Sequence, residues 1–170
     1  PKRSSPEGNH AANPSESSQD QTLFSRWFSG IKQVFSAPQE GIAPQESILG
    51  FVGVWFMVDE AHITSIGVRG GFKRRGIGEA LLISAIDLAV HRTCRTVTLE
   101  VRVSNTAAQA LYEKYGFARV GIRKGYYTDN REDAYVMSTD VITSAAYQSQ
   151  FQRLKEAHKA RWGESLRVLA

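Results

Sequence analysis

The sequence predicts an α/β fold of the α+β kind, a central mixed sheet flanked by helices. Strand-like apolar segments alternate with segments of helical periodicity from residue 48 onward. At two places, consecutive strand segments are separated only by a short polar stretch, as in β-hairpins. Parallel and antiparallel pairs are therefore expected in one sheet, which argues against a doubly wound, all-parallel arrangement.

The first half of the chain is expected to contain a helix and three strands. Apolar residues at helical spacing predict a short helix over Thr22–Phe28, and Ile31–Phe35 is a candidate strand. Prolines and glycines then mark a loop, after which two apolar strands are joined by a turn. In chain order these are a loop over Ser36–Glu46, a buried strand over Ile48–Val58, a turn at Asp59, Glu60 and Ala61, and a strand over His62–Val68.

The second half begins with a glycine-rich segment that leads into a helix expected over Gly78–His91. Apolar and polar residues then alternate over Thr96–Val103, which predicts a strand. Ser104 is placed to cap the next helix. The remaining elements are that helix over Thr106–Tyr115, ended by Gly116, two strands around a polar loop over Phe117–Ile122 and Ala134–Thr139, and an amphipathic helix over Tyr147–Trp162.

The 170 residues suit one folded domain with an extension at each end. Residues 1–20 are rich in Ser, Pro, Asn and Gln, so they are expected to form a flexible tail. Residues 21–143 are expected to form the domain. Residues 144–170 are expected to add a basic, amphipathic helical extension.

Composition narrows the classes of function. Apolar residues make up 42% and charged residues 22%, as in ordinary globular proteins, and the net charge of +4 is too small to argue for DNA binding. No segment approaches the roughly 20 apolar residues that span a membrane. The single cysteine, Cys94, is expected to be a small buried residue. Because it has no second cysteine to pair with, it also fits the reducing conditions of a cytoplasmic location. The histidines lack metal-ligand spacing, so no metal is expected, and His62 is interpreted as an ordinary strand residue.

A candidate anion site lies in the glycine-rich segment, which reads Lys-Arg-Arg-Gly-Ile-Gly-Glu from Lys73 to Glu79. Glycines between a strand and a helix let backbone N–H groups point outward, and the helix N-terminus adds a partial positive charge that suits phosphate. The segment lacks the Gly-Lys-Ser/Thr of a P-loop and the third glycine of a dinucleotide-binding fingerprint. A plain strand-to-helix turn remains the alternative.

This segment resembles the pyrophosphate loop of the GNAT acetyltransferases, Arg/Gln-x-x-Gly-x-Gly/Ala, with Lys73 at the position of Arg or Gln. The resemblance implies the GNAT acyl-CoA N-acyltransferase fold, with acetyl-coenzyme A as cosubstrate. It also implies that the preceding strand binds the pantetheine and acetyl group through its backbone. The coenzyme-binding residues so assigned are Ile66, Gly67, Val68, Arg74, Arg75, Gly76, Ile77, Gly78 and Glu79.

Glu100 and Tyr112 are the candidate acid–base residues. Strand alternation turns Glu100 away from the core, and periodicity alone predicts a solvent-facing residue paired with Arg102. Helical spacing alone places Tyr112 in the core. An attacking amine must lose a proton, however, and a leaving thiolate must gain one. A carboxylate and a tyrosine hydroxyl suit these two roles.

A longer stretch, from about Ile48 to Asp140, resembles the RimI family of protein N-terminal acetyltransferases. The matching segments are Asp59-Glu60-Ala61, Leu99 to Arg102, Ser104-Asn105, Ala110 to Glu113, Gly116-Phe117, Tyr126-Tyr127 and Arg131 to Ala134. The resemblance implies a general base at Glu100, a general acid at Tyr112 that also contacts the coenzyme, and a coenzyme contact at Asn105. It further implies that Tyr126 and Tyr127 close over the backbone of the acceptor peptide.

The expected function is therefore transfer of acetyl from acetyl-coenzyme A to the α-amino group of a protein N-terminus. In bacteria the resemblance implies a small-subunit ribosomal protein with an N-terminal alanine as the acceptor. Neither a membrane nor DNA is expected as a partner. Two alternatives stay open. One is a GNAT enzyme for lysine or a small amine, and the other is a non-catalytic module that binds coenzyme A on the ribosome.

Overall fold

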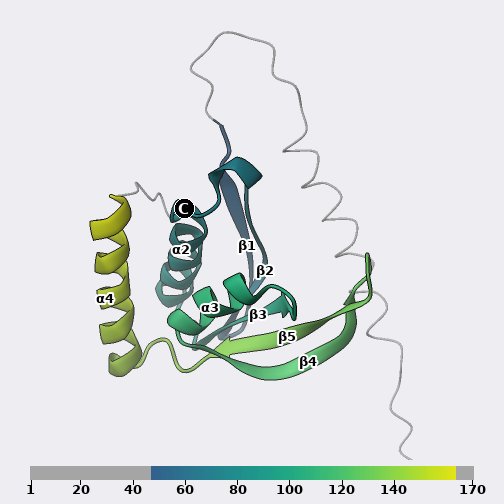
Figure 1. The fold of residues 1–170 in the computed structure, drawn as a ribbon. Helices are drawn as coiled ribbons and strands as arrows, with labels where there is room; N and C mark the ends of the chain where they lie inside the picture. Colours follow the sequence, from purple (N-terminus) through teal and green to yellow (C-terminus); the bar gives the residue numbers. More distant parts are fainter. Residues whose placement is uncertain (1–46, 164–170) are drawn as a thin grey trace, which may run out of the picture. The chain divides into compact units, whose positions relative to one another are not determined.

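The computed structural model describes residues 47–163 of the chain. The tail, helix, strand and loop expected before residue 47 lie outside the described residues. The elements are β1 (Gly50–Met57), β2 (Glu60–Val68), the 3-10 helix η1 (Gly70–Phe72), α2 (Ile77–His91), β3 (Thr96–Arg102), α3 (Thr106–Lys114), β4 (Phe117–Tyr127), β5 (Glu132–Thr139) and α4 (Ala145–Trp162) (Figure 1).

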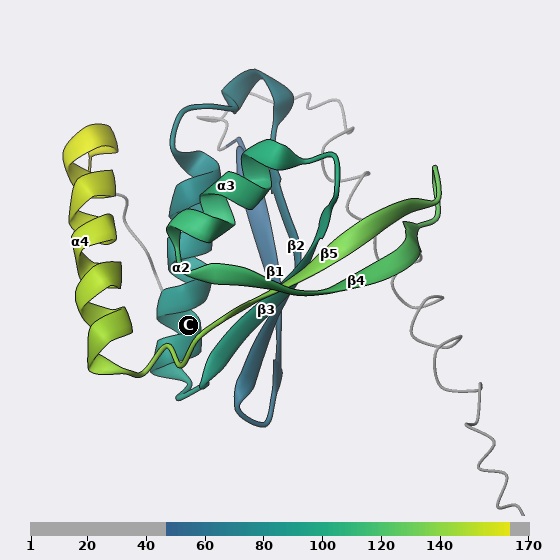
Figure 2. The same ribbon diagram turned by 60° about the horizontal axis from the view of Figure 1, so that its bottom comes forward.

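The five strands of the described residues form one mixed sheet in the order β1-β2-β3-β5-β4. Strands β2 and β3 are parallel, whereas the β1–β2, β3–β5 and β4–β5 pairs are antiparallel. A mixed sheet flanked by helices was the predicted fold class, and it is confirmed. The β4–β5 hairpin extends away from α2 and α4 (Figures 1 and 2).

The core lies between α2 and the sheet. Leu82, Ile83 and Ile86 of α2 are fully buried against Val97 and Leu99 of β3. Burial of each such side chain contributes roughly 1.5–3 kcal/mol to folding. The alternation predicted for β3 is confirmed, because its apolar side chains face this core and its polar side chains face the other side of the sheet. The prediction of Cys94 as a buried residue is also confirmed.

The β1–β2 hairpin differs from its prediction in two respects. Its turn is Val58–Asp59, and Glu60 and Ala61 already belong to β2 rather than to the turn. The prediction of β1 as a buried strand is wrong, since Trp55 is half exposed in the described structure. A continuous apolar run can also form an edge strand, because periodicity does not report what covers the second face.

Both strands of the β4–β5 hairpin are longer than predicted. The polar residues after Ile122 and before Ala134 continue the strands, and only residues 128–131 remain as the loop. The hairpin carries a bulge near its tip, where the register moves from Arg123 opposite Ala134 to Tyr127 opposite Glu132. A bulge lets a polar, glycine-containing stretch stay within a ladder.

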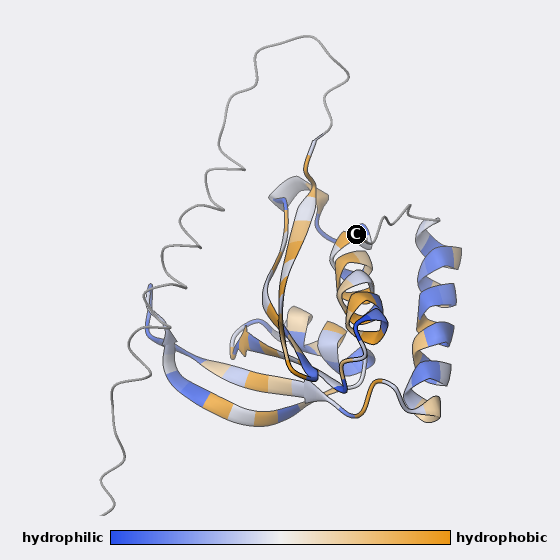
Figure 3. Cartoon of the chain, turned by 180° about the vertical axis from the view of Figure 1, so that it is seen from behind, coloured by the Kyte–Doolittle hydropathy of each residue, from blue (hydrophilic) through white to orange (hydrophobic). Residues whose placement is uncertain are grey.

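The last helix, α4, begins two residues before its predicted start and ends at the predicted residue. Ser144 caps it by accepting a hydrogen bond from the Tyr147 N–H at 3.3 Å. The helix buries only Phe151 and His158, and most of its surface is hydrophilic, in contrast to α2 (Figure 3). No helix between residues 47 and 163 is long and apolar enough to cross a membrane.

Candidate active site

The central strands β2 and β3 separate partway along the sheet. They pair only from Glu60 opposite Thr96 to Ile63 opposite Leu99, although β2 continues for five more residues, through Val68. A bulge lies at the point of separation, because Thr64 has no partner in the β1 register. Bulges of this kind are common next to active sites, where they redirect the backbone. The result is an opening between two parallel strands at the middle of the sheet.

The opening exposes main-chain polar groups of β2. The N–H of Arg69 donates to the Leu49 carbonyl at 2.8 Å, and the Gly67 carbonyl lies beside Gly50, so both groups face β1. Backbone polar groups alternate in direction along a strand, and the N–H and C=O groups of Ile66 and Val68 therefore face the opening. Strand β3 offers them no pairing partner.

The glycine-rich loop follows directly and leads into α2. Arg74 and Gly76 both have positive φ, at 64° and 76°, a backbone pattern that turns successive N–H groups to one side. Within residues 47–163, the N–H groups of residues 74–79 donate to no carbonyl or side chain, whereas the Ala80 N–H donates to Gly76. The side chains of Lys73, Arg74 and Arg75 are exposed around them. These donors and cations suit a bound diphosphate.

The side chain of Glu79 makes its polar contacts outside this loop. Its carboxylate accepts hydrogen bonds from Lys114 Nζ at 2.6 Å and from Tyr115 Oη at 2.8 Å. Burial raises the pKa of Glu79, but these two hydrogen bonds outweigh burial and lower the pKa. Glu79 thus joins α2 to α3, and its backbone N–H is the group that can donate to an anionic ligand.

Glu100 lies on β3 beside the opening and is almost fully enclosed, with 6% of its side chain exposed. One carboxylate oxygen is 3.1 Å from His62 Nε2 on β2, and the other is 3.1 Å from Arg123 Nη2 on β4. The alternative of a solvent-facing Glu100 paired with Arg102 is wrong, because Arg102 pairs with Asp129 and Glu132 instead.

The hydrogen bonds around His62 define where its protons lie. Thr98 Oγ1 donates to Glu60 Oε1 at 2.6 Å, so this hydroxyl can only accept from His62 Nδ1, which is 2.8 Å away. Nδ1 therefore carries a proton, and Nε2 is the nitrogen that faces Glu100. The pair thus places two groups that can accept a proton, Nε2 of His62 and the Glu100 carboxylate, 3.1 Å apart.

Tyr112 lies on α3 and is 5% exposed, with its ring 5.8 Å from that of Phe117. Burial raises the pKa of Tyr112 to about 12, so the hydroxyl keeps its proton at neutral pH. The prediction from helical periodicity that Tyr112 lies in the core is confirmed. A buried, protonated phenol is also the state that an acid requires.

Asn105, rather than Ser104, is the N-cap of α3. Its side-chain Oδ1 accepts a hydrogen bond from the Ala108 N–H at 3.2 Å, whereas the backbone N–H of Ser104 donates to Glu132 at 2.8 Å. Both residue types cap helices well, so the sequence does not distinguish them. The cap uses one lone pair of Oδ1, so Nδ2 and the second lone pair remain for a coenzyme contact by Asn105.

Tyr126 and Tyr127 lie together at the end of β4, with ring centroids 5.2 Å apart and planes at 89°. Each ring is covered by an arginine that also binds an acid. Arg123, 5.5 Å from the Tyr126 ring, pairs with Glu100, and Arg102, 3.8 Å from the Tyr127 ring, pairs with acids of the β4–β5 loop. The geometry therefore connects the tyrosine pair to Glu100.

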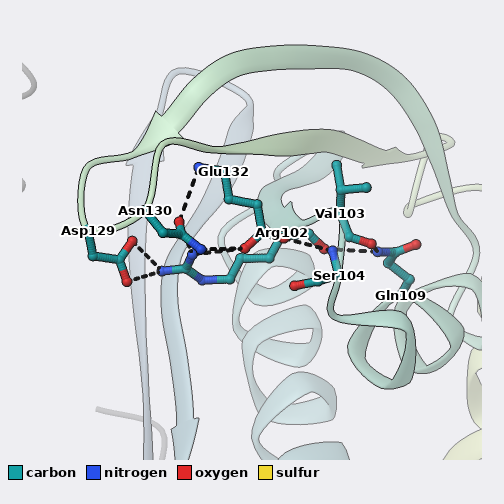
Figure 4. A network of polar contacts seen from close by, with 7 residues as sticks. All are labelled: Arg102, Val103, Ser104, Gln109, Asp129, Asn130 and Glu132. Atoms are coloured by element: carbon teal, nitrogen blue, oxygen red, sulfur yellow. Dashed lines mark hydrogen bonds and ion pairs between the residues drawn. The ribbon is translucent and has the colours of Figure 1, made fainter.

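Arg102 is the centre of the polar network drawn in Figure 4. Its Nη2 donates to both carboxylate oxygens of Asp129 at 2.9 Å, and its Nη1 donates to Asn130 and Glu132 at 3.0 Å. Gln109 closes the network from α3 by donating to the carbonyls of Arg102 and Val103 at 2.9 Å. The network fixes the hairpin loop to the end of β3.

Sequence reasoning did not assign His62, Thr98 and Arg123 to the site. The sequence signal for His62 is its place as a polar residue between the apolar Ala61 and Ile63. Thr98 could not be found without the register of β3 against β2, nor Arg123 without the registers of β3 and β4 against β5. No group of three or more metal-ligating side chains is present in the part of the chain that the structure describes.

Residues 7–117 match the model of the Acetyltransferase (GNAT) family. An 87-residue segment, 50% of this chain and 59% of the relative, is 46% identical to the ribosomal protein bS18-alanine N-acetyltransferase of Escherichia coli (strain K12). An 83-residue segment, 48% of this chain and 49% of the relative, is 42% identical to an N-alpha-acetyltransferase of Saccharolobus solfataricus.

A solved structure shows a similar fold. The crystal structure of the ribosomal-protein-S18-alanine N-acetyltransferase from Escherichia coli matches with a TM-score of 0.53 at 41% identity, over 57% of this chain and 64% of that chain. The chain spans less than two thirds of the length of each of these relatives.

Proposed function

The chain belongs to the acetyltransferase (GNAT) family, and we propose that it transfers acetyl from acetyl-coenzyme A to the N-terminal α-amino group of a protein. We propose a ribosomal protein with an N-terminal alanine as the acceptor. The names of the Escherichia coli and Saccharolobus solfataricus relatives support amino-terminal acetylation, and the former supports the ribosomal acceptor. The observation that carries the proposal is the enclosed His62–Glu100 pair beside the opening between β2 and β3.

The residues around the opening fit coenzyme A. The N–H groups of residues 74–79 have no acceptor among the described residues, and three exposed cations surround them, as a diphosphate requires. The backbone groups of Ile66 and Val68 are open to the amides of a pantetheine arm. One of their N–H groups could also stabilise the oxyanion that forms when an amine attacks a thioester.

The His62–Glu100 pair supplies the base in this proposal. Glu100 takes the proton that the attacking amine releases, and His62 Nε2 shares it at 3.1 Å. The Thr98–Glu60 contact keeps Nδ1 protonated, so Nε2 remains the acceptor. Arg123 neutralises the carboxylate from the other side and keeps it in place.

Tyr112 supplies the acid. Its hydroxyl donates a proton to the thiolate as the carbon–sulfur bond breaks, and the proton held by Glu100 is then returned to the phenolate through solvent. The raised pKa of Tyr112, about 12, keeps the hydroxyl protonated until that moment. Tyr126 and Tyr127 form the acceptor side, because their ring pair is joined to Glu100 through Arg123.

The decisive experiment is a panel of matched peptides with free or blocked N-termini, with and without an internal lysine. We expect the peptides with a free N-terminal alanine to be acetylated and the blocked, lysine-containing ones to remain unmodified. Glu100→Gln should lower kcat by about 100-fold or more, the usual contribution of a general base, while coenzyme A binding is retained. Acetylation of the blocked peptides, or full turnover by the Glu100 variant, would contradict the proposal.

A further inference from the structure

The C-terminal helix α4 contacts the glycine-rich loop at Gly76, the residue that precedes α2. The Nε2 atom of His158 is 3.1 Å from the Gly76 carbonyl, and the His158 side chain is buried. The Trp162 ring covers the same residue so closely that a Cβ atom on Gly76 would lie 2.7 Å from two ring carbons. His158 and Trp162 are four residues apart and thus occupy one face of α4.

The direction of the His158 hydrogen bond follows from its partner. The Gly76 carbonyl also accepts the Ala80 N–H at 2.9 Å, and a carbonyl can only accept, so His158 Nε2 must carry a proton. A trans peptide is planar, and its C=O and N–H groups point in opposite directions. By holding the Gly76 carbonyl, His158 therefore fixes the opposite direction of the Ile77 N–H, one of the donors with no acceptor among the described residues.

Helix α4 is itself held along its length. Lys155 Nζ is 2.8 Å from Asp87 Oδ1 on α2, and Tyr147 Oη donates to the Tyr115 carbonyl at 3.0 Å. Phe151 is buried in edge contact with the Tyr115 ring. Figures 1 and 2 both show α4 beside α2. His158 and Trp162 are therefore presented to the loop by a fixed helix.

We propose that α4 is a positioning element of the coenzyme site, in which His158 and Trp162 hold the Gly76–Ile77 peptide with its N–H toward the bound diphosphate. The inference rests on the proposed function, since it assumes that the loop binds coenzyme A. It adds a part of the chain outside the segment that the family model matches, residues 7–117. Gly76 has a φ of 76°, in the left-handed region, and the Trp162 ring packs over it in this conformation.

The test compares His158→Leu with His158→Gln, whose side-chain amide can donate from nearly the position of Nε2. We expect His158→Leu to raise both the Kd for coenzyme A and the KM for acetyl-coenzyme A by about tenfold, as loss of one buried hydrogen bond would, with kcat unchanged. His158→Gln should restore most of the affinity. Trp162→Ala should raise the same constants and Trp162→Phe should raise them less. Gln152→Leu, at an exposed position on α4, is the matched control.

Thermal unfolding of each variant identifies any that do not fold. If His158→Leu or Trp162→Ala does not fold, His158→Gln and Trp162→Phe still allow a comparison with the wild type. Equal coenzyme A affinity for wild type and His158→Leu would overturn the inference and leave the proposed function intact. Failure of the wild-type chain to bind coenzyme A would overturn the proposed function itself. Hydrogen exchange with coenzyme A bound adds an independent measure, since His158→Leu should weaken the protection that the ligand gives to residues 74–79.

Discussion

At the scale of single residues, Glu100 shows how side chains on other strands determine the environment of a carboxylate. Strand alternation turns its side chain away from the core, where a carboxylate would ordinarily be solvated. Side chains from β2 and β4 enclose it instead, as His62 and Arg123 reach its two oxygens. The carboxylate therefore lies between an imidazole nitrogen and a guanidinium group, each 3.1 Å from one of its oxygens.

The contact between His62 and Glu100 predicts a loss of activity when the imidazole is replaced. In His62→Gln, the amide can still donate to Glu100 but cannot take up a proton. We expect kcat/KM to fall by about 10- to 100-fold, because the amide cannot share the proton that the attacking amine releases. The other polar groups around this pair, namely Glu60, Thr98, Arg123 and Tyr126, are unchanged in the variant.

Steady-state kinetics with a free N-terminal peptide between pH 5 and 9 would provide this measurement. His91→Gln, at the exposed end of α2, removes a histidine outside the site and should match the wild type. A kcat/KM for the His62 variant equal to that of the wild type would contradict the prediction.

The partner of Glu100 also explains one limit of sequence reasoning at this scale. His62 pairs directly with Thr98 and therefore lies diagonally across from Glu100, and Arg123 reaches Glu100 from β4, one strand beyond β5. The face of Glu100 could be predicted from alternation, but its partners depend on the order and register of the strands around β3.

At the scale of elements, the β4–β5 hairpin depends on Arg102 for its position. Arg102 joins the end of β3 to the hairpin loop and covers the Tyr127 ring at 3.8 Å. Arg102→Met keeps the length of the side chain but loses its charge and hydrogen bonds. We expect the KM for an acceptor peptide to rise by about tenfold, equivalent to roughly 1.4 kcal/mol, with little change in coenzyme A affinity.

Peptide kinetics and coenzyme A titration of the same preparation separate the two effects. Arg131→Met, which removes an exposed arginine from the same loop, is the control and should leave the KM near that of wild type. An unchanged peptide KM in Arg102→Met would show that the hairpin position does not affect acceptor binding.

The length of this hairpin also shows why its element boundaries were predicted poorly. Lys124 and Gly125 suggest a loop, yet Asp133 accepts the Gly125 N–H at 2.8 Å and Lys124 Nζ at 2.7 Å. One carboxylate on the partner strand thus keeps a bulged, polar segment within the ladder. Local propensity does not reveal such a contact, because it is made across the hairpin.

At the scale of the whole molecule, acid stability should depend on Glu132. Hydrogen bonds from Ser104 and then Arg102 lower the pKa of Glu132 from 4.5 to about 2. A carboxylate with a lowered folded-state pKa stabilises the fold above its unfolded value, and this contribution disappears as the pH falls through the folded value. Glu132→Gln should therefore be less stable than wild type at pH 7, and the difference should shrink between about pH 4.5 and pH 2.

Urea unfolding at pH 7, 5, 4 and 3 would measure this difference in the free energy of unfolding. Glu156→Gln, on the exposed face of α4, controls for the general loss of a carboxylate. A difference for Glu132→Gln that stays constant or grows as the pH falls would contradict the assignment.

The sequence alone determined the fold class, the order of the elements, the glycine-rich loop and the face of β3 that carries Glu100, because periodicity and turn residues act over short distances in the chain. Only the tertiary structure decided where β2 leaves β3, which residues enclose Glu100, and that α4 lies against Gly76. Those features depend on strand register and helix docking, which bring together residues between 23 and 82 positions apart.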